Sequence, residues 1–118
     1  MVKINCRRVD GVTVVDVVGR ITLGDGSTLL RDTIRGLIAA GDKQILVNLG
    51  EVGYIDSSGL GELVSAFTAV RAEGGDLKLL HLTRKVHDLL QITKLYTVFD
   101  IHDDEAQAIS SYEVRHAH

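Results

Sequence analysis

The sequence predicts a single α/β domain with a mixed, mostly parallel sheet. Short β-branched runs bounded by glycine, such as "QILVNL", alternate with segments whose apolar residues recur at the 3.6-residue helical period. The predicted order is strand, strand, helix, strand, helix, strand, helix, strand, helix, with a right-handed crossover between successive parallel strands. A length of 118 residues suits one domain.

The first part of the chain predicts a hairpin and a helix. Asp10-Gly11 is a two-residue turn signal. Before the turn, apolar residues including Cys6 alternate with polar ones, as in a half-exposed strand; after it, "VTVVDVVG" reads as a more buried strand. The stretch "LGDGST" then supplies a turn, Ser27 or Thr28 can cap the first helix, and Gly41 ends it.

The rest of the chain predicts three more strand–helix pairs. A helix is expected from about Ser58 to Gly74-Gly75, followed by the strand "DLKLLHL", a third helix around residues 86–93, the strand "TVFDIH" and a closing helix over about 103–112. The domain is expected to cover residues 1–113 and a short tail residues 114–118.

Composition excludes several classes of function. A net charge of −3 without a basic cluster gives no electrostatic footprint for nucleic acid. No apolar run approaches the roughly 20 residues that span a membrane, so a cytoplasmic protein is expected. The five histidines show no tight ligand spacing, and neither a metal nor another cofactor is expected.

The stretch "YIDSSGLGELV", residues 54–64, places two serines where a strand hands over to a helix. A nucleophile elbow requires glycine two residues to either side of the serine. Neither serine meets that requirement, because Ile55 precedes Ser57 and Asp56 precedes Ser58 at that spacing. His81 or His87 could approach as a base, but both are more typical of surface or strand-end histidines. The lysine of a phosphate-binding loop is absent.

A helix start is the remaining interpretation of the motif. Ser57 or Ser58 can accept hydrogen bonds from the free N–H groups of the first turn. Gly59 and Gly61 cost about 1 kcal/mol each in a helix interior, and we interpret them as positions where backbone or a partner approaches closely.

On these residues the sequence resembles the STAS domain, specifically bacterial anti-sigma factor antagonists. The strand–"DSSGLG"–helix unit carries the family's regulatory phosphorylation site, and "VVDVVGRI", "ILVNL", "RAEGGDLKLLHL" and "VHDLLQITKLYTVFDI" match its other segments. The resemblance covers nearly the whole chain and implies the family fold, a superhelix of βα turns.

The resemblance implies protein binding without catalysis. A family member binds, when unphosphorylated, an anti-sigma factor that is also a serine kinase of the histidine-kinase-like ATPase fold, and so frees the sigma factor. The kinase phosphorylates the first serine of the motif, Ser57 here, and a serine phosphatase restores binding.

The resemblance also assigns roles around Ser57. It implies that Ser58 is the cap and that Asp56 contacts the kinase or orients the serine hydroxyl, the alternative for Asp56 being a simple cap or turn residue. The family has an aspartate in the loop after the second strand; here Thr22 takes that place and Asp25 could compensate. The alternative function that the resemblance allows for this chain is an interaction module of a stressosome-like scaffold or other partner-switching system, or a soluble subunit of a lipid or anion transport system.

Overall fold

A single five-stranded sheet runs through the protein, whose computed structural model describes residues 2–112. The predicted element order is confirmed, with a short 3-10 helix, η1, after the third helix. The strands are β1 (Val2–Val9), β2 (Val12–Ile21), β3 (Gln44–Ile55), β4 (Asp76–Leu82) and β5 (Ile101–His102). The helices are α1 (Asp25–Ala39), α2 (Ser57–Ala72), α3 (Arg84–Thr93), η1 (Leu95–Thr97) and α4 (Glu105–Ser110).

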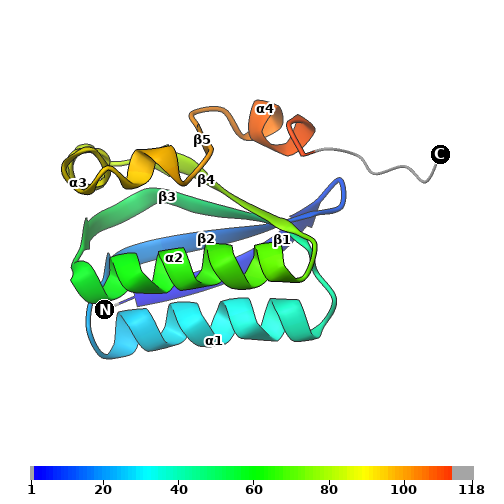
Figure 1. Ribbon diagram of the computed structural model, residues 1–118, viewed down its shortest axis with the longest axis horizontal. Coiled ribbons are helices and arrows are strands. Elements are labelled where there is room, and N and C mark those ends of the chain that lie inside the picture. Colours follow the sequence, from blue (N-terminus) through cyan, green and yellow to red (C-terminus); the bar gives the residue numbers. More distant parts are fainter. Residues whose placement is uncertain (1, 113–118) are drawn as a thin grey trace.

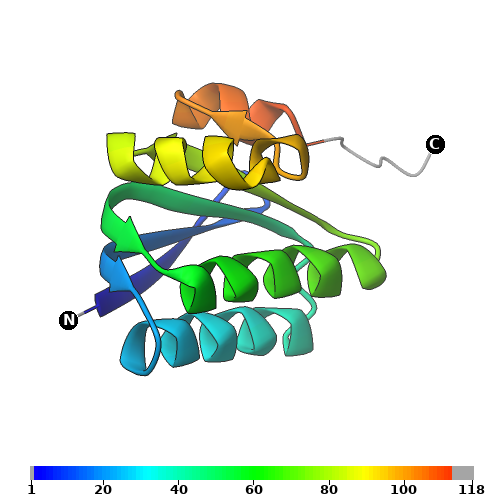
Figure 2. The ribbon, with the colours of Figure 1, turned by 60° about the vertical axis from the view of Figure 1, so that its left-hand side comes forward.

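The strands lie in sequence order, so each crossover connects neighbours. β1 is antiparallel to β2, and all later pairs are parallel. The predicted hairpin turn is confirmed, because Asp10 and Gly11 have φ angles of 49° and 82° and join Val9 directly to its partner Val12. α1 and α2 lie side by side on one side of the sheet, and α4 lies on the other (Figures 1 and 2).

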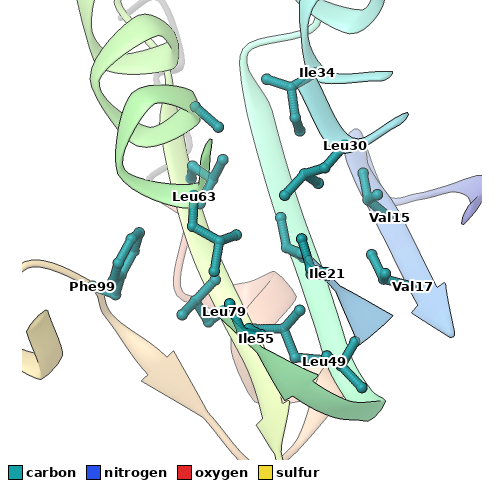
Figure 3. Packing of buried hydrophobic residues seen from close by; sticks show 14 of the residues in the cluster. Val15, Val17, Ile21, Leu30, Ile34, Leu49, Ile55, Leu63, Leu79 and Phe99 are labelled. Atoms are coloured by element: carbon teal, nitrogen blue, oxygen red, sulfur yellow. The ribbon is translucent and has the colours of Figure 1, made fainter. Parts of the chain in front are cut away.

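The main core lies between the sheet and helices α1 and α2 (Figure 3). Strand positions two residues apart face these helices, as the period of a strand requires. Leu30 and Ile34 of α1 and Leu63 of α2 meet them from the helix side. The fully buried strand members include Val15, Val17, Ile21, Ile45, Val47, Leu49, Ile55, Leu77 and Leu79. Phe67 of α2 meets Phe99 edge to face at 5.4 Å between ring centroids.

A second, smaller apolar cluster lies on the opposite face under α4. Ala108 and Tyr112 cover buried strand residues here. These strand residues are Val12, Val14, Leu46 and Leu80. Tyr112 donates a hydrogen bond to the Ile45 carbonyl, which fixes the end of the described chain to the sheet.

Several sequence expectations need correction. α1 begins after Gly24, which provides no side-chain cap, so neither Ser27 nor Thr28 caps it. The predicted strand "TVFDIH" shortens to β5, because the preceding residues form η1 and bury Phe99 in the core. Cys6 lies on the same face of β1 as Val2 and Ile4, as its register partner Val15 shows, but it is exposed.

Other boundaries agree with the prediction. Gly41 and Gly74 have φ angles of 92° and 82° and follow the ends of α1 and α2, as expected of helix-stopping glycines. The expected domain limit at residue 113 and the tail over 114–118 lie outside the described residues.

Candidate functional site at the start of helix α2

The two serines of the motif lie where the β2–α1 loop meets the β3–α2 junction. Ile21 and Ile55 are register partners at the carboxyl ends of adjacent parallel strands. The Asp56 amide donates to the Ile21 carbonyl at 3.3 Å, one residue beyond that pair. The sheet therefore brings the loop that contains Thr22 against the first turn of α2.

Asp56 caps α2. Its Oδ1 accepts from the Gly59 amide at 2.9 Å, and its Oδ2 accepts from the Leu23 amide at 2.9 Å. These backbone hydrogen bonds, that of Gly59 first, hold the pKa of the Asp56 carboxyl below its ordinary value, so it is a carboxylate at neutral pH. The cap expected at Ser58 is thus wrong, because the carboxylate one residue before the helix occupies the capping position.

Ser57 is the first residue of α2 and is exposed. Within residues 2–112 its hydroxyl makes no hydrogen bond. Ser58 is half-buried, and its hydroxyl lies 3.1 Å from the hydroxyl of buried Ser27, which also lies 3.0 Å from the Thr22 carbonyl. The two adjacent serines therefore differ in access: Ser57 is free and Ser58 belongs to the contact between α1 and α2.

The two glycines of the motif also differ. A Cβ at Gly59 would lie 2.2 Å from the Ile21 carbonyl oxygen and 2.8 Å from Ile55 Cγ2, so Gly59 allows α2 to pack on the strand ends. Of the two alternatives expected for Gly59, close approach of backbone or of a partner, the structure shows the first. A Cβ at Gly61 would meet nothing within 4 Å, so Gly61 leaves an open patch on the exposed side of α2.

The loop residues singled out by sequence lie beside this site. Thr22 is half-buried, and its carbonyl accepts from the Ser27 amide at 3.0 Å. Asp25 is the first residue of α1 and is exposed. Thr22 lies in the loop that Asp56 holds through Leu23, and Asp25 begins the helix that follows this loop.

Sequence reasoning missed an apolar and cationic surface around the site. Leu23 is 80% exposed and Tyr54 is 41% exposed. The Arg20 guanidinium lies 5.5 Å from the centroid of the Tyr54 ring. A leucine between Thr22 and Gly24, in a turn that favours polar residues, was the signal that could have pointed to this surface.

The histidines considered for an enzyme lie elsewhere. His87 is exposed on α3, where its Nδ1 lies 3.4 Å from Asp88 Oδ1. His81 has a φ of 54° at an irregular position of β4 and packs beside Gly50. In the described part of the chain neither Ser57 nor Ser58 has a hydroxyl that bonds to a histidine, so the motif serines lack the histidine base of a serine hydrolase there.

Between residues 2 and 112, no three histidine, cysteine or acidic side chains gather in a way that would hold a metal ion. None of the helices described there combines the length and apolarity of a membrane span.

Fold and site together define a small α/β domain that presents an exposed serine at the start of a capped helix. Residues 3–108 match the STAS domain family, and the chain belongs to that family. The fold is shared with solved structures. A structure from Thermotoga maritima, described as a putative anti-sigma factor antagonist, superposes with a TM-score of 0.86 at 23% identity, covering 92% of this chain and 93% of that one.

Curated relatives are named as anti-sigma factor antagonists. The anti-sigma-B factor antagonist of Bacillus subtilis is 34% identical over 87 residues, which is 74% of this chain and 78% of the relative. The anti-sigma F factor antagonist of Paenibacillus polymyxa is 29% identical over 72 residues, 61% of this chain and 62% of that relative. The Bacillus cell fate determinant SpoIIAA in its phosphorylated form gives a TM-score of 0.71 at 21% identity, covering 92% of this chain and 97% of that one.

Proposed function

We propose that this protein is an anti-sigma factor antagonist switched by phosphorylation of Ser57. Unphosphorylated, it binds an anti-sigma factor that is also a serine kinase, and so releases a sigma factor. Phosphorylation ends that binding, and a serine phosphatase restores it. The observation that carries the proposal is the exposure of Ser57 on the first turn of α2, where its hydroxyl makes no hydrogen bond within residues 2–112.

The electrostatics of the helix start support such a switch. A phosphate on Ser57 would add about −1.5 to −2 charges beside the carboxylate of Asp56. The positive end of the helix dipole offsets part of this charge within the fold. At a contact surface, however, the paired charges resist loss of water and repel acidic groups of a partner. We therefore expect phosphorylation to weaken binding much more than it weakens folding.

Asp56, Ser58, Gly61, Thr22 and Asp25 surround Ser57 on the proposed contact surface. Gly61 allows a partner to approach the exposed side of α2, since nothing lies within 4 Å of its Cβ position. Asp56 keeps the β2–α1 loop next to Ser57, so that a partner can contact loop and helix together. Thr22 and Asp25 supply polar groups from that loop.

The experiment is kinase labelling followed by binding measurements. Purified kinases of the histidine-kinase-like ATPase fold from the source genome are incubated singly with ATP and this protein, and mass spectrometry locates the phosphate. We expect one phosphate, on Ser57, from one cognate kinase, and no modification or ATP turnover by the protein alone. A phosphate on Ser58 or Thr22, with Ser57→Ala still fully modified, would contradict the assignment.

Binding to that kinase then tests the charge switch. Ser57→Asp should bind at least tenfold more weakly by calorimetric titration, a difference of about 1.4 kcal/mol. Ser57→Ala should bind like the parent and resist phosphorylation. Both should unfold within about 1 kcal/mol of the parent, since Asp56 supplies the cap. Tight binding by Ser57→Asp would rule out a charge mechanism.

A further inference from the structure

The sheet face opposite α1 and α2 is only half covered by helix. α4 covers the end of this face where the parallel strands begin, and it buries Val12, Val14 and Leu46 there. Further along β2 the same face reaches Val18, which is 45% exposed. The change from buried to exposed along one strand places an open sheet surface beside the carboxyl ends of the strands.

Two cross-strand rows form this surface. In the first row, Val18 of β2 is the register partner of Lys3 on β1 and of Glu51 on β3. In the second row, Arg20 of β2 is the register partner of Tyr54 on β3. Side chains of register partners share a face, and all five residues are exposed. We call Lys3, Val18, Arg20, Glu51 and Tyr54 the open face.

The cations of the open face have no acidic partner of their own. Arg7, on the same strand as Lys3, pairs with Asp16 at 2.6 Å and with Glu105 at 2.6 Å. By contrast, neither Lys3 nor Arg20 forms an ion pair within residues 2–112. The Arg20 guanidinium instead lies over the Tyr54 ring, at 5.5 Å from its centroid. This stack fixes the arginine and leaves its donors available, an arrangement typical of interface anchors.

The open face has the width of one helix and continues into the serine site. Three strands spaced by about 4.8 Å span about 10 Å, close to the 10–12 Å diameter of a helix with side chains. Tyr54 precedes Asp56 by two residues, and Leu23, 80% exposed, is held to Asp56 by its amide. A segment lying on the open face would therefore end beside Ser57.

We propose that the open face binds an acidic amphipathic helix of a protein partner. Val18 and Tyr54 receive the apolar side of that helix, and Lys3 and Arg20 receive its carboxylates. Glu51 lies on the β3 side, so the bound helix carries its acids on the side toward β1 and β2. This binding goes beyond the proposed switch, because it does not depend on the phosphorylation of Ser57.

The test uses a synthetic helical peptide with one leucine stripe flanked by glutamates, and a control peptide with lysine at every glutamate. Titration into the ¹⁵N-labelled full chain, followed by NMR, should shift the amides of Lys3, Val18, Arg20 and Tyr54 with the acidic peptide only. The chain has a net charge of −3, so general electrostatics oppose this peptide and binding requires a local site.

Charge-reversal variants make the test specific. Lys3→Glu/Arg20→Glu should weaken acidic-peptide binding at least tenfold, and the neutral pair Lys3→Gln/Arg20→Gln should lie between this variant and the parent. The matched control Arg84→Glu/Lys85→Glu changes the charge equally on exposed positions of α3 and should bind like the parent. Melting curves confirm that each variant is folded, and the neutral pair decides the matter if charge reversal prevents folding.

Three results would overturn the proposal: no shifts with the acidic peptide, equal shifts with the lysine peptide, or shifts centred on α3. Ser57→Ala should bind the acidic peptide with unchanged affinity. A protein that no kinase modifies but that still binds the peptide would refute the proposed function and keep this surface. A protein that switches at Ser57 without binding the peptide would support the proposed function and refute the proposal for the open face.

Discussion

The carboxylate of Asp56 accepts from two backbone amides, that of Gly59 in its own helix and that of Leu23 in the β2–α1 loop. Sequence spacing offered three acceptors for the cap, namely Asp56, Ser57 and Ser58. It could not choose among them, because all three residue types favour the position. The structure decides by register: β3 ends at Ile55, so Asp56 is the last non-helical residue.

The glycines of the motif show the same limit at the residue scale. Both were interpreted as positions of close approach, and the pattern could not tell an approach within the fold from one by a partner. Gly59 faces the strand ends, whereas Gly61, two residues further round the helix, faces open space. Only the direction in which each position points separates the two roles.

Alanine at each glycine should therefore have opposite effects on stability. Gly59→Ala places a methyl group against the Ile21 carbonyl and should lower the free energy of unfolding by about 1–3 kcal/mol. Gly61→Ala meets nothing and improves helix propensity, so it should raise that free energy by up to about 1 kcal/mol. Urea unfolding of both variants measures the difference. Equal destabilisation would show that Gly61 also packs.

At the element scale, strands and long helices followed from sequence, and the last strand did not. Glycines and apolar periodicity located α2 and β4 closely, since those patterns report burial directly. The run "TVFDIH" has the composition of a strand, yet Phe99 enters the core beside Phe67 from a non-strand segment. Tertiary packing overrides local propensity where a single large side chain can fill the core.

Ion pairs as well as apolar contacts hold α4 against the sheet. Arg7 on β1 bridges Asp16 on β2 and Glu105 in the first turn of α4. The Arg7 guanidinium lowers the pKa of Glu105. Burial raises the pKa of Asp16, but hydrogen bonds from Arg7 and Asn48 outweigh it, so that pKa is also lowered.

These shifts predict that the ion pairs of Arg7 with Asp16 and Glu105 stabilise the fold less in acid. A carboxyl whose pKa is lower in the folded state stabilises the fold above its unfolded pKa, about 4, and loses that contribution as pH falls through the folded value. The melting-temperature difference between the parent and Glu105→Gln should therefore be present at pH 7 and shrink below about pH 4. Asp103→Asn, an exposed acid before the same helix, serves as control. A difference that stays constant with pH would contradict the bridge.

At the scale of the whole molecule, two apolar clusters on opposite faces of one sheet differ in size. The large one joins α1, α2 and α3 to the strands, and the small one is covered by α4 and by Tyr112, which follows it. Alternation in "VTVVDVVG" was hidden by its nearly continuous apolar character, so sequence showed that both faces are buried but not which helix covers each. That division follows from how the chain turns after β5, where it leads into α4 on the opposite face.

Local unfolding should also differ between the two clusters, with α4 opening separately from the rest of the domain. Tyr112→Ala removes the ring that covers the small cluster and its hydrogen bond to Ile45, so it should speed hydrogen exchange of the α4 amides and leave those of β3 slow. Val70→Ala, within the large cluster, should lower protection throughout. Amide exchange followed by NMR makes the comparison. Uniform acceleration by both variants would mean that α4 opens only with the entire domain.

Asp56 caps α2, and Gly59 allows α2 to pack on the strand ends. Natural selection therefore acts on these two positions through stability and on their neighbour Ser57 for a different reason. Substitutions at 56 and 59 lower the stability of the fold, whatever the partner requires. Under the proposed function, substitutions at 57 change the fold little and are selected through signalling alone. After a gene duplication, one copy could lose its serine and persist as a permanently binding paralogue. Under the proposed function, the layout of this one helical turn gives the lineage an easy route from a switched regulator to a constitutive one.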